Sequence, residues 1–142
     1  GPKKFLTLAA KPPAPGNEVI VMGYPTGLRS MLAQSGDAFI EELQKSGDTE
    51  FWSVAARLAQ KKLIAPLASR GIVGQTTSAA IVYDAETTHG GSGGPVLDIN
   101  GEVVAVNAAI LPEYGGSNLG VPVSKVRELL KGLKLEPSKP GK

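Results

Sequence analysis

The sequence lacks cysteine, and its 142 residues include a single histidine, His89. Without cysteine the fold needs no disulfides, and the compartment stays open because periplasmic and cytosolic proteins can both lack them. No apolar run reaches the roughly 18 residues of a membrane-spanning helix. No cluster of histidines or carboxylates has metal-ligand spacing. We therefore expect neither a metal nor a cofactor.

The sequence also lacks a strong charge of either sign. Its 15 basic and 13 acidic residues give a net charge of +2 and are interspersed along the chain. Part of the basic excess comes from lysines near the two ends. A nucleic-acid-binding domain would concentrate positive charge on one face. The sequence shows no such face, so we expect no nucleic-acid partner.

Turn-forming residues are abundant, with 18 glycines and 11 prolines. That content is high for a helical protein and is typical of a mainly β fold with many turns. Hydrophobic residues make up 42% of the chain, which indicates a globular protein and not a disordered one. The length predicts a single domain.

Several short apolar or alternating segments are bounded by turn residues, the pattern of β-strands. Asn100-Gly101 separates two of them and is the strongest two-residue hairpin signal. Pro122 implies a sheet edge or a bulge. The expected strands are residues 5–8, 18–23, 71–77, 79–83, 96–99, 102–109 and 119–123.

One segment, about 28–68, breaks this β pattern. Its apolar residues recur at roughly helical spacing, and Ser46-Gly47-Asp48 interrupts them. We predict an inserted two-helix hairpin, with Asp48 or Thr49 capping its second helix. Its apolar face is expected to pack on the β domain. Three alternative roles of the insertion stay open: a lid, a partner surface or a membrane contact. The adjacent aromatic residues Phe51 and Trp52 favour an interaction.

Two further features concern the end of the chain. Ser124 is predicted to cap a terminal helix from Lys125 to about Leu133. Residues 136–142 are polar and proline-rich and are expected to form a flexible tail. Gly1-Pro2 is typical of the residues left when an affinity tag is removed. The predicted domain therefore covers residues 3–135.

The most informative motif is residues 88–95, with sequence THGGSGGP, which surrounds Ser92 with glycines before an apolar strand. Glycines permit tight or positive-φ turns and let a substrate carbonyl approach the backbone closely. Free N–H groups in such a turn can stabilise a developing oxyanion. This combination of hydroxyl and glycines is suited to nucleophilic catalysis.

This motif resembles the nucleophile loop of trypsin-like serine proteases, most closely the bacterial HtrA-like branch. About two-thirds of the chain follows the same order as the second barrel of that fold. The resemblance implies the C-terminal, six-stranded Greek-key β-barrel half of a chymotrypsin-like protease, with the helical insertion and the terminal helix added. The segments that carry it are GYPTGL, SRGIV, DAETTHGGSGGP, GEVVAVN and LGVP.

The resemblance also implies roles for individual residues. Ser92 would be the nucleophile, Gly90 and Ser92 would donate N–H groups to the oxyanion, and Gly91 would lie between them. Glu86 would lie near the base of the specificity pocket and favour a basic substrate residue. Residues 86–88, 105–108 and 116–120 would line that pocket. The substrate-binding residues that the resemblance implies are Glu86, Thr87, His89, Val106, Asn107, Ala108 and Gly120.

The chain departs from the family in lacking the other two members of the triad. That chemistry needs a histidine base and an orienting acid, which the family carries on its first barrel. His89 lies only three residues before Ser92, so we expect it at the pocket rim and not as the base. Asp84 is expected to be a turn or hydrogen-bonding residue.

Two functions follow as expectations. The first is the C-terminal half of a serine endopeptidase that cleaves polypeptides, inactive alone because an N-terminal half must supply histidine and aspartate. The alternative is a non-catalytic pseudoprotease module that binds a peptide or a partner protein. The bare face between the two halves could support a homo-oligomer. The resemblance favours a periplasmic or secreted location.

Overall fold

The computed structural model describes residues 4–24, 27–87, 91–111 and 117–133. Six antiparallel strands close into a barrel in the order β1-β2-β3-β6-β5-β4. Closure gives every strand two neighbours and leaves no open sheet edge. The predicted six-stranded, mainly β barrel is therefore confirmed. The strands are β1 Glu18–Gly23, β2 Leu67–Thr76, β3 Ile81–Tyr83, β4 Pro95–Leu97, β5 Val103–Leu111 and β6 Ser117–Pro122.

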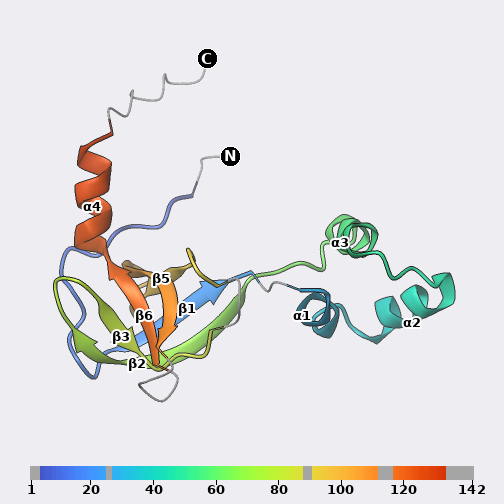
Figure 1. Ribbon diagram of the computed structural model, residues 1–142, viewed down its shortest axis with the longest axis horizontal. Coiled ribbons are helices and arrows are strands. Elements are labelled where there is room, and N and C mark those ends of the chain that lie inside the picture. The colour runs from blue at the N-terminus through green and yellow to red at the C-terminus, as the bar shows by residue number, and fades with distance from the viewer. Residues whose placement is uncertain (1–3, 25–26, 88–90, 112–116, 134–142) are drawn as a thin grey trace.

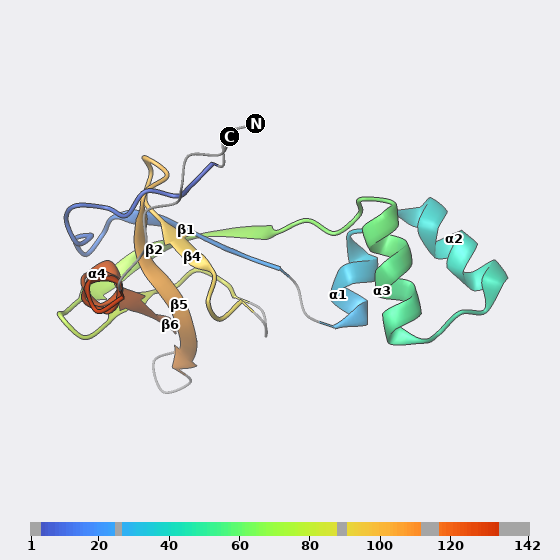
Figure 2. The same ribbon diagram turned by 90° about the horizontal axis from the view of Figure 1, so that it is seen from above.

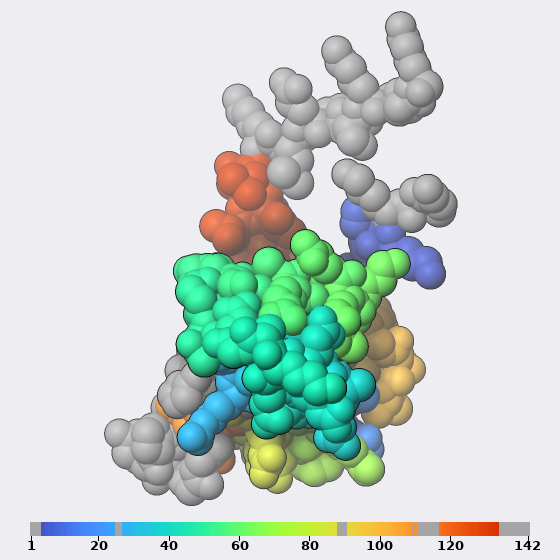
Figure 3. All heavy atoms as spheres, turned by 90° about the vertical axis from the view of Figure 1, so that its right-hand side faces the viewer, coloured from blue at the N-terminus to red at the C-terminus, as the bar shows by residue number. Residues whose placement is uncertain are grey.

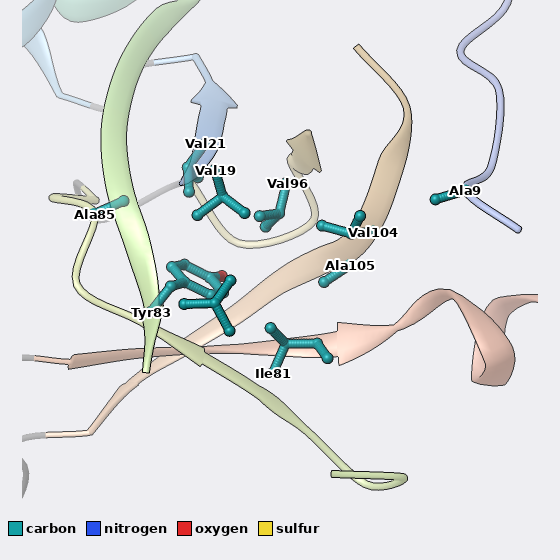
Figure 4. Close-up of a cluster of buried hydrophobic side chains, with 10 residues drawn as sticks. Ala9, Val19, Val21, Ile81, Tyr83, Ala85, Val96, Val104 and Ala105 are labelled. Atoms are coloured by element: carbon teal, nitrogen blue, oxygen red, sulfur yellow. The ribbon is translucent and has the colours of Figure 1, made fainter. Parts of the chain in front are cut away.

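Alternation of side chains along the strands builds the barrel core. Val19 and Val21 on β1, and Ile81 and Tyr83 on β3, point inward and are buried. Figure 4 shows them converging with Val96 of β4 and Val104 of β5. Side chains alternate between the two faces of a strand, so a slip of one residue in the register would move every buried side chain to the outside of the barrel. The hydrophobic pattern therefore determines how the strands pair.

The strand that we predicted at residues 5–8 is reduced to one bridge. Leu8 pairs in parallel with Val103, and the Ala9 N–H donates to the Val103 carbonyl at 2.8 Å. Phe5 and Leu6 are exposed. The chain then runs on through the prolines of residues 12–15, which cannot donate ladder hydrogen bonds.

The inserted segment contains three helices, so the predicted two-helix hairpin is wrong. They are α1 Leu28–Ala33, α2 Asp37–Ser46 and α3 Phe51–Gln60. Gly36 has a φ of +83° and separates α1 from α2. Glu50, and not Asp48 or Thr49, caps α3: its carboxylate accepts from the Trp52 and Ser53 N–H groups at 3.1 and 2.6 Å.

These helices form a module with a core of its own. Met31, Phe39, Val54 and Leu58 are buried against one another, and the apolar residues packed around them also belong to the insertion. Figures 1 and 2 show the module projecting from one end of the barrel on two connecting segments. Seen from its outer end, it stands in front of the barrel (Figure 3). The expectation that its apolar face packs on the barrel is therefore wrong.

The terminal helix α4, Val123–Lys131, begins two residues earlier than predicted, and Ser124 does not cap it. The helix starts directly from β6 because the Val123 side chain is buried against Leu97 and Val103. Pro122 pairs with Ala105 of β5, whereas the β3 partners of β6 end at Gly120. Pro122 thus has a strand on one side only, as its missing N–H requires.

Candidate functional site

The described part of the glycine loop begins at Gly91 and leads into β4. Gly91 is buried, whereas Ser92 is exposed at the tip of the turn. The Gly94 N–H donates to the Gly91 carbonyl at 3.0 Å. Two further backbone bonds join the loop to Asn107 of β5: Gly93 N–H to Asn107 O at 2.7 Å, and Asn107 N–H to Gly94 O at 2.9 Å. The turn that carries Ser92 is thus held to the barrel wall.

Glycine is required at two positions of this turn. Gly93 has a φ of +89°, which L side chains rarely adopt. A Cβ on Gly94 would lie 2.1 Å from the Met22 carbonyl oxygen, at the end of β1. The close packing of β1 on the loop therefore depends on these glycines, as the sequence pattern indicated.

The Ser92 hydroxyl points back toward β5. Its Oγ donates to the Ala108 carbonyl at 3.0 Å. A backbone carbonyl accepts a hydrogen bond but is not a general base, so this contact leaves the hydroxyl neutral and weakly nucleophilic. Among the described residues, the hydrogen-bond partner of this hydroxyl is therefore a neutral backbone group.

A buried polar pair includes Asn107, the residue whose backbone holds the loop. The Tyr83 hydroxyl donates to Asn107 Oδ1 at 2.5 Å inside the barrel. Burial raises the pKa of the Tyr83 phenol above its usual range, so the group stays a neutral donor. Figure 4 shows the Tyr83 ring among the core side chains. Asn107 therefore connects the core to the backbone of the glycine loop.

A pocket of about 530 Å³ opens beside the loop. Its volume lies within the range of about 300–1,000 Å³ that is typical of ligand sites. Glu86 is the one charged residue among the described residues that line it. The lining residues are Val21, Gly23, Leu67, Ala68, Ser69, Glu86, Thr87, Gly91, Ile110 and Asn118.

Side-chain hydrogen bonds hold the segment that carries Glu86. Ser69 Oγ donates to the Glu86 carbonyl, and Asn118 Nδ2 donates to the Ala85 carbonyl. Asn118 Oδ1 accepts from Thr87 Oγ1 at 2.8 Å. Residues of β2 and β6 thus position the wall of the pocket from both sides.

Asp84 has the hydrogen-bonding role that we predicted. Its Oδ1 accepts the Ile72 N–H at 2.6 Å, and its own N–H donates to the Ile72 carbonyl at 3.3 Å. The carboxylate therefore stabilises the junction of β2 with the segment after β3.

Apart from Ser92, the predicted site residues divide into three groups. Glu86, Thr87 and Gly91 line the pocket, as does Asn118 from the predicted range 116–120. Val106, Asn107, Ala108 and Gly120 do not line it, and Gly120 packs against Ala105 and the Tyr83 ring. His89 and Gly90 lie outside the described residues. The catalytic and binding roles of all these residues stay predictions.

The sequence analysis missed the pocket residues that come from β1 and β2. Gly23 and Leu67 are partners at the end of the β1–β2 ladder, although the whole helical module separates them along the chain. The resemblance included GYPTGL, which begins at Gly23, and SRGIV, which begins at Ser69, but not Leu67. Only the strand pairing shows that they form one wall of the pocket.

In the part of the chain that the structure describes, no group of three or more histidine, cysteine, aspartate or glutamate side chains could hold a metal ion. Within the same ranges no helix is long and apolar enough to cross a membrane.

The closed antiparallel barrel and the glycine turn at its rim define the class of trypsin-like peptidase domains. The sequence profile of the trypsin-like peptidase domain family matches residues 2–106, and the chain belongs to that family.

Solved structures share this fold. An inactive serine-to-alanine mutant of Rv3671c from M. tuberculosis H37Rv superposes with a TM-score of 0.60 and 18% identity, over 97% of this chain and 58% of that one. The active form of the M. tuberculosis Rv3671c protease gives 0.61 and 16%, over 98% and 52%. A serine endoprotease from Yersinia pestis gives 0.58 and 16%, over 89% and 34%. The chain therefore spans between a third and three-fifths of these proteases.

Proposed function

We propose that this chain is the nucleophile-bearing half of a trypsin-like serine endopeptidase of the HtrA-like kind. Ser92 is the nucleophile, and the N–H groups of Gly90 and Ser92 bind the oxyanion. Glu86 and Thr87 contribute to the specificity pocket, which takes a side chain of an extended polypeptide.

The observation that carries this proposal is the position of Ser92. The exposed serine stands on a positive-φ glycine turn, and its neighbour Gly91 lines the pocket. A reacting carbonyl held at Ser92 would have its side chain directed into that pocket. In acyl-transfer sites the nucleophile lies in this way next to the pocket that recognises a substrate side chain.

The chain alone is expected to be inactive. It contains one histidine, and the Ser92 hydroxyl bonds to a carbonyl that cannot take its proton. We assign the base and its orienting acid to a segment outside this sequence. The compared proteases are longer than this chain, in agreement with such a segment.

Exposed apolar side chains support a partner surface for that segment. Phe5 and Leu6 are 83% and 56% exposed, and Leu129 on α4 is 69% exposed. Arg127 of α4 donates to the carbonyls of Leu8 and Ala9 at 3.3 and 2.7 Å, so the two exposed regions are neighbours. The missing half, or a second copy of the chain, would cover them.

Labelling with a fluorophosphonate probe and intact-mass detection tests this proposal. The probe is applied to this chain and to the chain extended by its native upstream sequence. We expect labelling only of the extended protein and its loss in Ser92→Ala. Ser124→Ala, on α4, is the matched control and retains labelling. A probe adduct in neither protein would overturn the catalytic proposal.

The alternative is a non-catalytic module that binds peptides through the same pocket. The Ser92–Ala108 hydrogen bond favours it, because a serine without a base can still line a binding groove. An upstream sequence without a histidine and an aspartate would support this alternative. Peptide binding by the extended protein without labelling would do the same.

A further inference from the structure

A second pocket, of about 410 Å³, lies at the other end of the barrel. Three strands contribute to both pockets from opposite ends. On β2, Leu67–Ser69 line the first pocket and Thr76 the second. On β5, Ile110 lines the first and Val104 the second. On β6, Asn118 lines the first and Pro122 the second. A ligand in the second pocket would therefore not contact Ser92, and the inference below does not rest on the proposed function.

The charged residues of this second pocket are both cations. Lys11 and Arg127 line it, and none of its lining residues is acidic. Within the described ranges Lys11 makes no ion pair. Arg127 is half-buried and held by the Leu8 and Ala9 carbonyls through Nη2. Because the guanidinium carries five N–H donors, others stay available to a ligand. The two positive charges of the pocket therefore favour an anionic ligand.

The remaining polar groups are hydroxyls. Ser78, in the turn after β2, and Ser124, in the first turn of α4, line the pocket. Neither hydroxyl has a hydrogen-bond partner among the residues that the structure describes. A hydroxyl both donates and accepts, so such groups can bind the N–H and the C=O of an amide.

The walls are apolar. Val104, Pro122 and Val123 form them, and all three are already largely buried in the barrel or at its junction with α4. An inorganic anion would gain nothing from these walls, because burying apolar surface stabilises only an apolar group. A fatty acid would use the walls and the cations but would leave the hydroxyls without a role.

We propose that this second pocket binds the C-terminal end of a polypeptide with an apolar last residue. Lys11 and Arg127 bind its carboxylate, Ser78 and Ser124 bind the last peptide groups, and Val104, Pro122 and Val123 contact the side chain. Charge-assisted hydrogen bonds to an anchored guanidinium are the stronger kind. Anchoring lowers the conformational entropy that binding costs.

Fluorescence polarisation with two labelled peptides tests the proposal. Both end in valine; one has a free carboxylate and the other a C-terminal amide. The free acid is expected to bind the 142-residue chain, and the amide to bind at least about tenfold more weakly. Lys11→Gln is expected to weaken binding of the acid by about threefold to fivefold. Lys45→Gln, on α2, is the matched control and leaves it unchanged.

NMR shift mapping identifies the site in the same samples. Shifts at Lys11, Ser78, Ser124 and Arg127 support the proposal, and Ser124→Ala reduces the affinity while the spectrum of the barrel is kept. Equal binding of acid and amide, no binding, or shifts confined to Glu86 and Gly91 would each overturn it. Competition by octanoate as strong as by the peptide would also overturn it, in favour of an aliphatic acid.

Discussion

The Tyr83 hydroxyl donates its hydrogen bond to Asn107 Oδ1 in the interior of the barrel. The Asn107 backbone in turn bonds to Gly93 and Gly94. A buried polar group without a partner is costly. Asn107 thus takes part both in a buried hydrogen bond of the core and in the backbone bonds that hold the glycine loop.

Removing that hydroxyl is expected to destabilise the protein. Tyr83→Phe leaves Asn107 Oδ1 buried without its donor and lowers the free energy of unfolding by about 1–3 kcal/mol. Urea denaturation measures this change. Tyr24→Phe is the matched control, because Tyr24 is 60% exposed, and it leaves the urea midpoint unchanged. Equal midpoints for the two variants would show that the buried hydrogen bond contributes nothing net.

The helical module is expected to unfold separately from the barrel. Leu58 is completely buried, and its buried neighbours Met31, Phe39 and Val54 all belong to the module. Leu58→Ala removes core volume and destabilises the three helices by about 2–5 kcal/mol. Hydrogen exchange should then accelerate in residues 28–63, whereas the six strands keep their protection.

Leu129→Ala provides the control, since Leu129 is 69% exposed on α4. Leu129→Ala should leave hydrogen exchange unchanged in both the helical module and the barrel. If Leu58→Ala accelerated exchange in the strands as much as in the helices, the module and the barrel would be one cooperative unit.

Acid is expected to weaken the helical module. The Lys61 ammonium, 2.7 Å from Glu42, and then Arg57 hold the pKa of Glu42 below its ordinary value of 4.5. Hydrogen bonds from Ser53 and the Glu50 N–H lower the pKa of Asp48 below 3.8. The unfolded module binds these protons more readily, so stability is complete above the ordinary values and falls as the pH falls through the lower, folded ones.

Hydrogen exchange of residues 28–63 between neutral pH and about pH 3 measures this effect. Glu42→Gln should flatten the pH dependence of the module. Glu41→Gln, one residue away on α2, is the control, because none of the ion pairs between described residues involves Glu41. An identical pH profile for Glu42→Gln and the unmodified chain would contradict the assignment.

Glu86 is expected to give the first pocket a preference for cations, as the proposed function requires. Benzamidine, an aromatic amidinium, should bind the chain and shift the NMR signals of Glu86, Thr87 and Asn118. Glu86→Gln removes the one charge in the described lining and should weaken binding by about tenfold or more. Equal affinity of both proteins for benzamidine would refute this specificity.

The sequence by itself determined the strands and the glycine turn, whereas the closed barrel was implied by the resemblance to trypsin-like proteases. The strands follow from local alternation and turn residues, and β1 has the predicted bounds, 18–23. The position of Ser92 on a glycine turn also follows locally, because the turn needs residues without a Cβ at Gly93 and Gly94. Both features depend on patterns that span only a few residues.

Local patterns were insufficient for the helical module. Apolar residues at helical spacing indicated helices, but not how many or what they pack against. Phe39 of α2 and Leu58 of α3 are buried in one cluster within the module. We had expected the barrel to cover the apolar face of these helices. Periodicity reports that a face is buried and says nothing of the partner that covers it.

Only the tertiary structure decided which residues form the two pockets. Gly23 and Leu67 share a wall because β1 and β2 pair around the insertion, and Lys11 meets Arg127 because α4 lies beside the N-terminal segment. Such contacts join residues far apart in the chain, and their loop-closure entropy is offset only by the packing of the whole barrel. No short stretch of sequence contains that information.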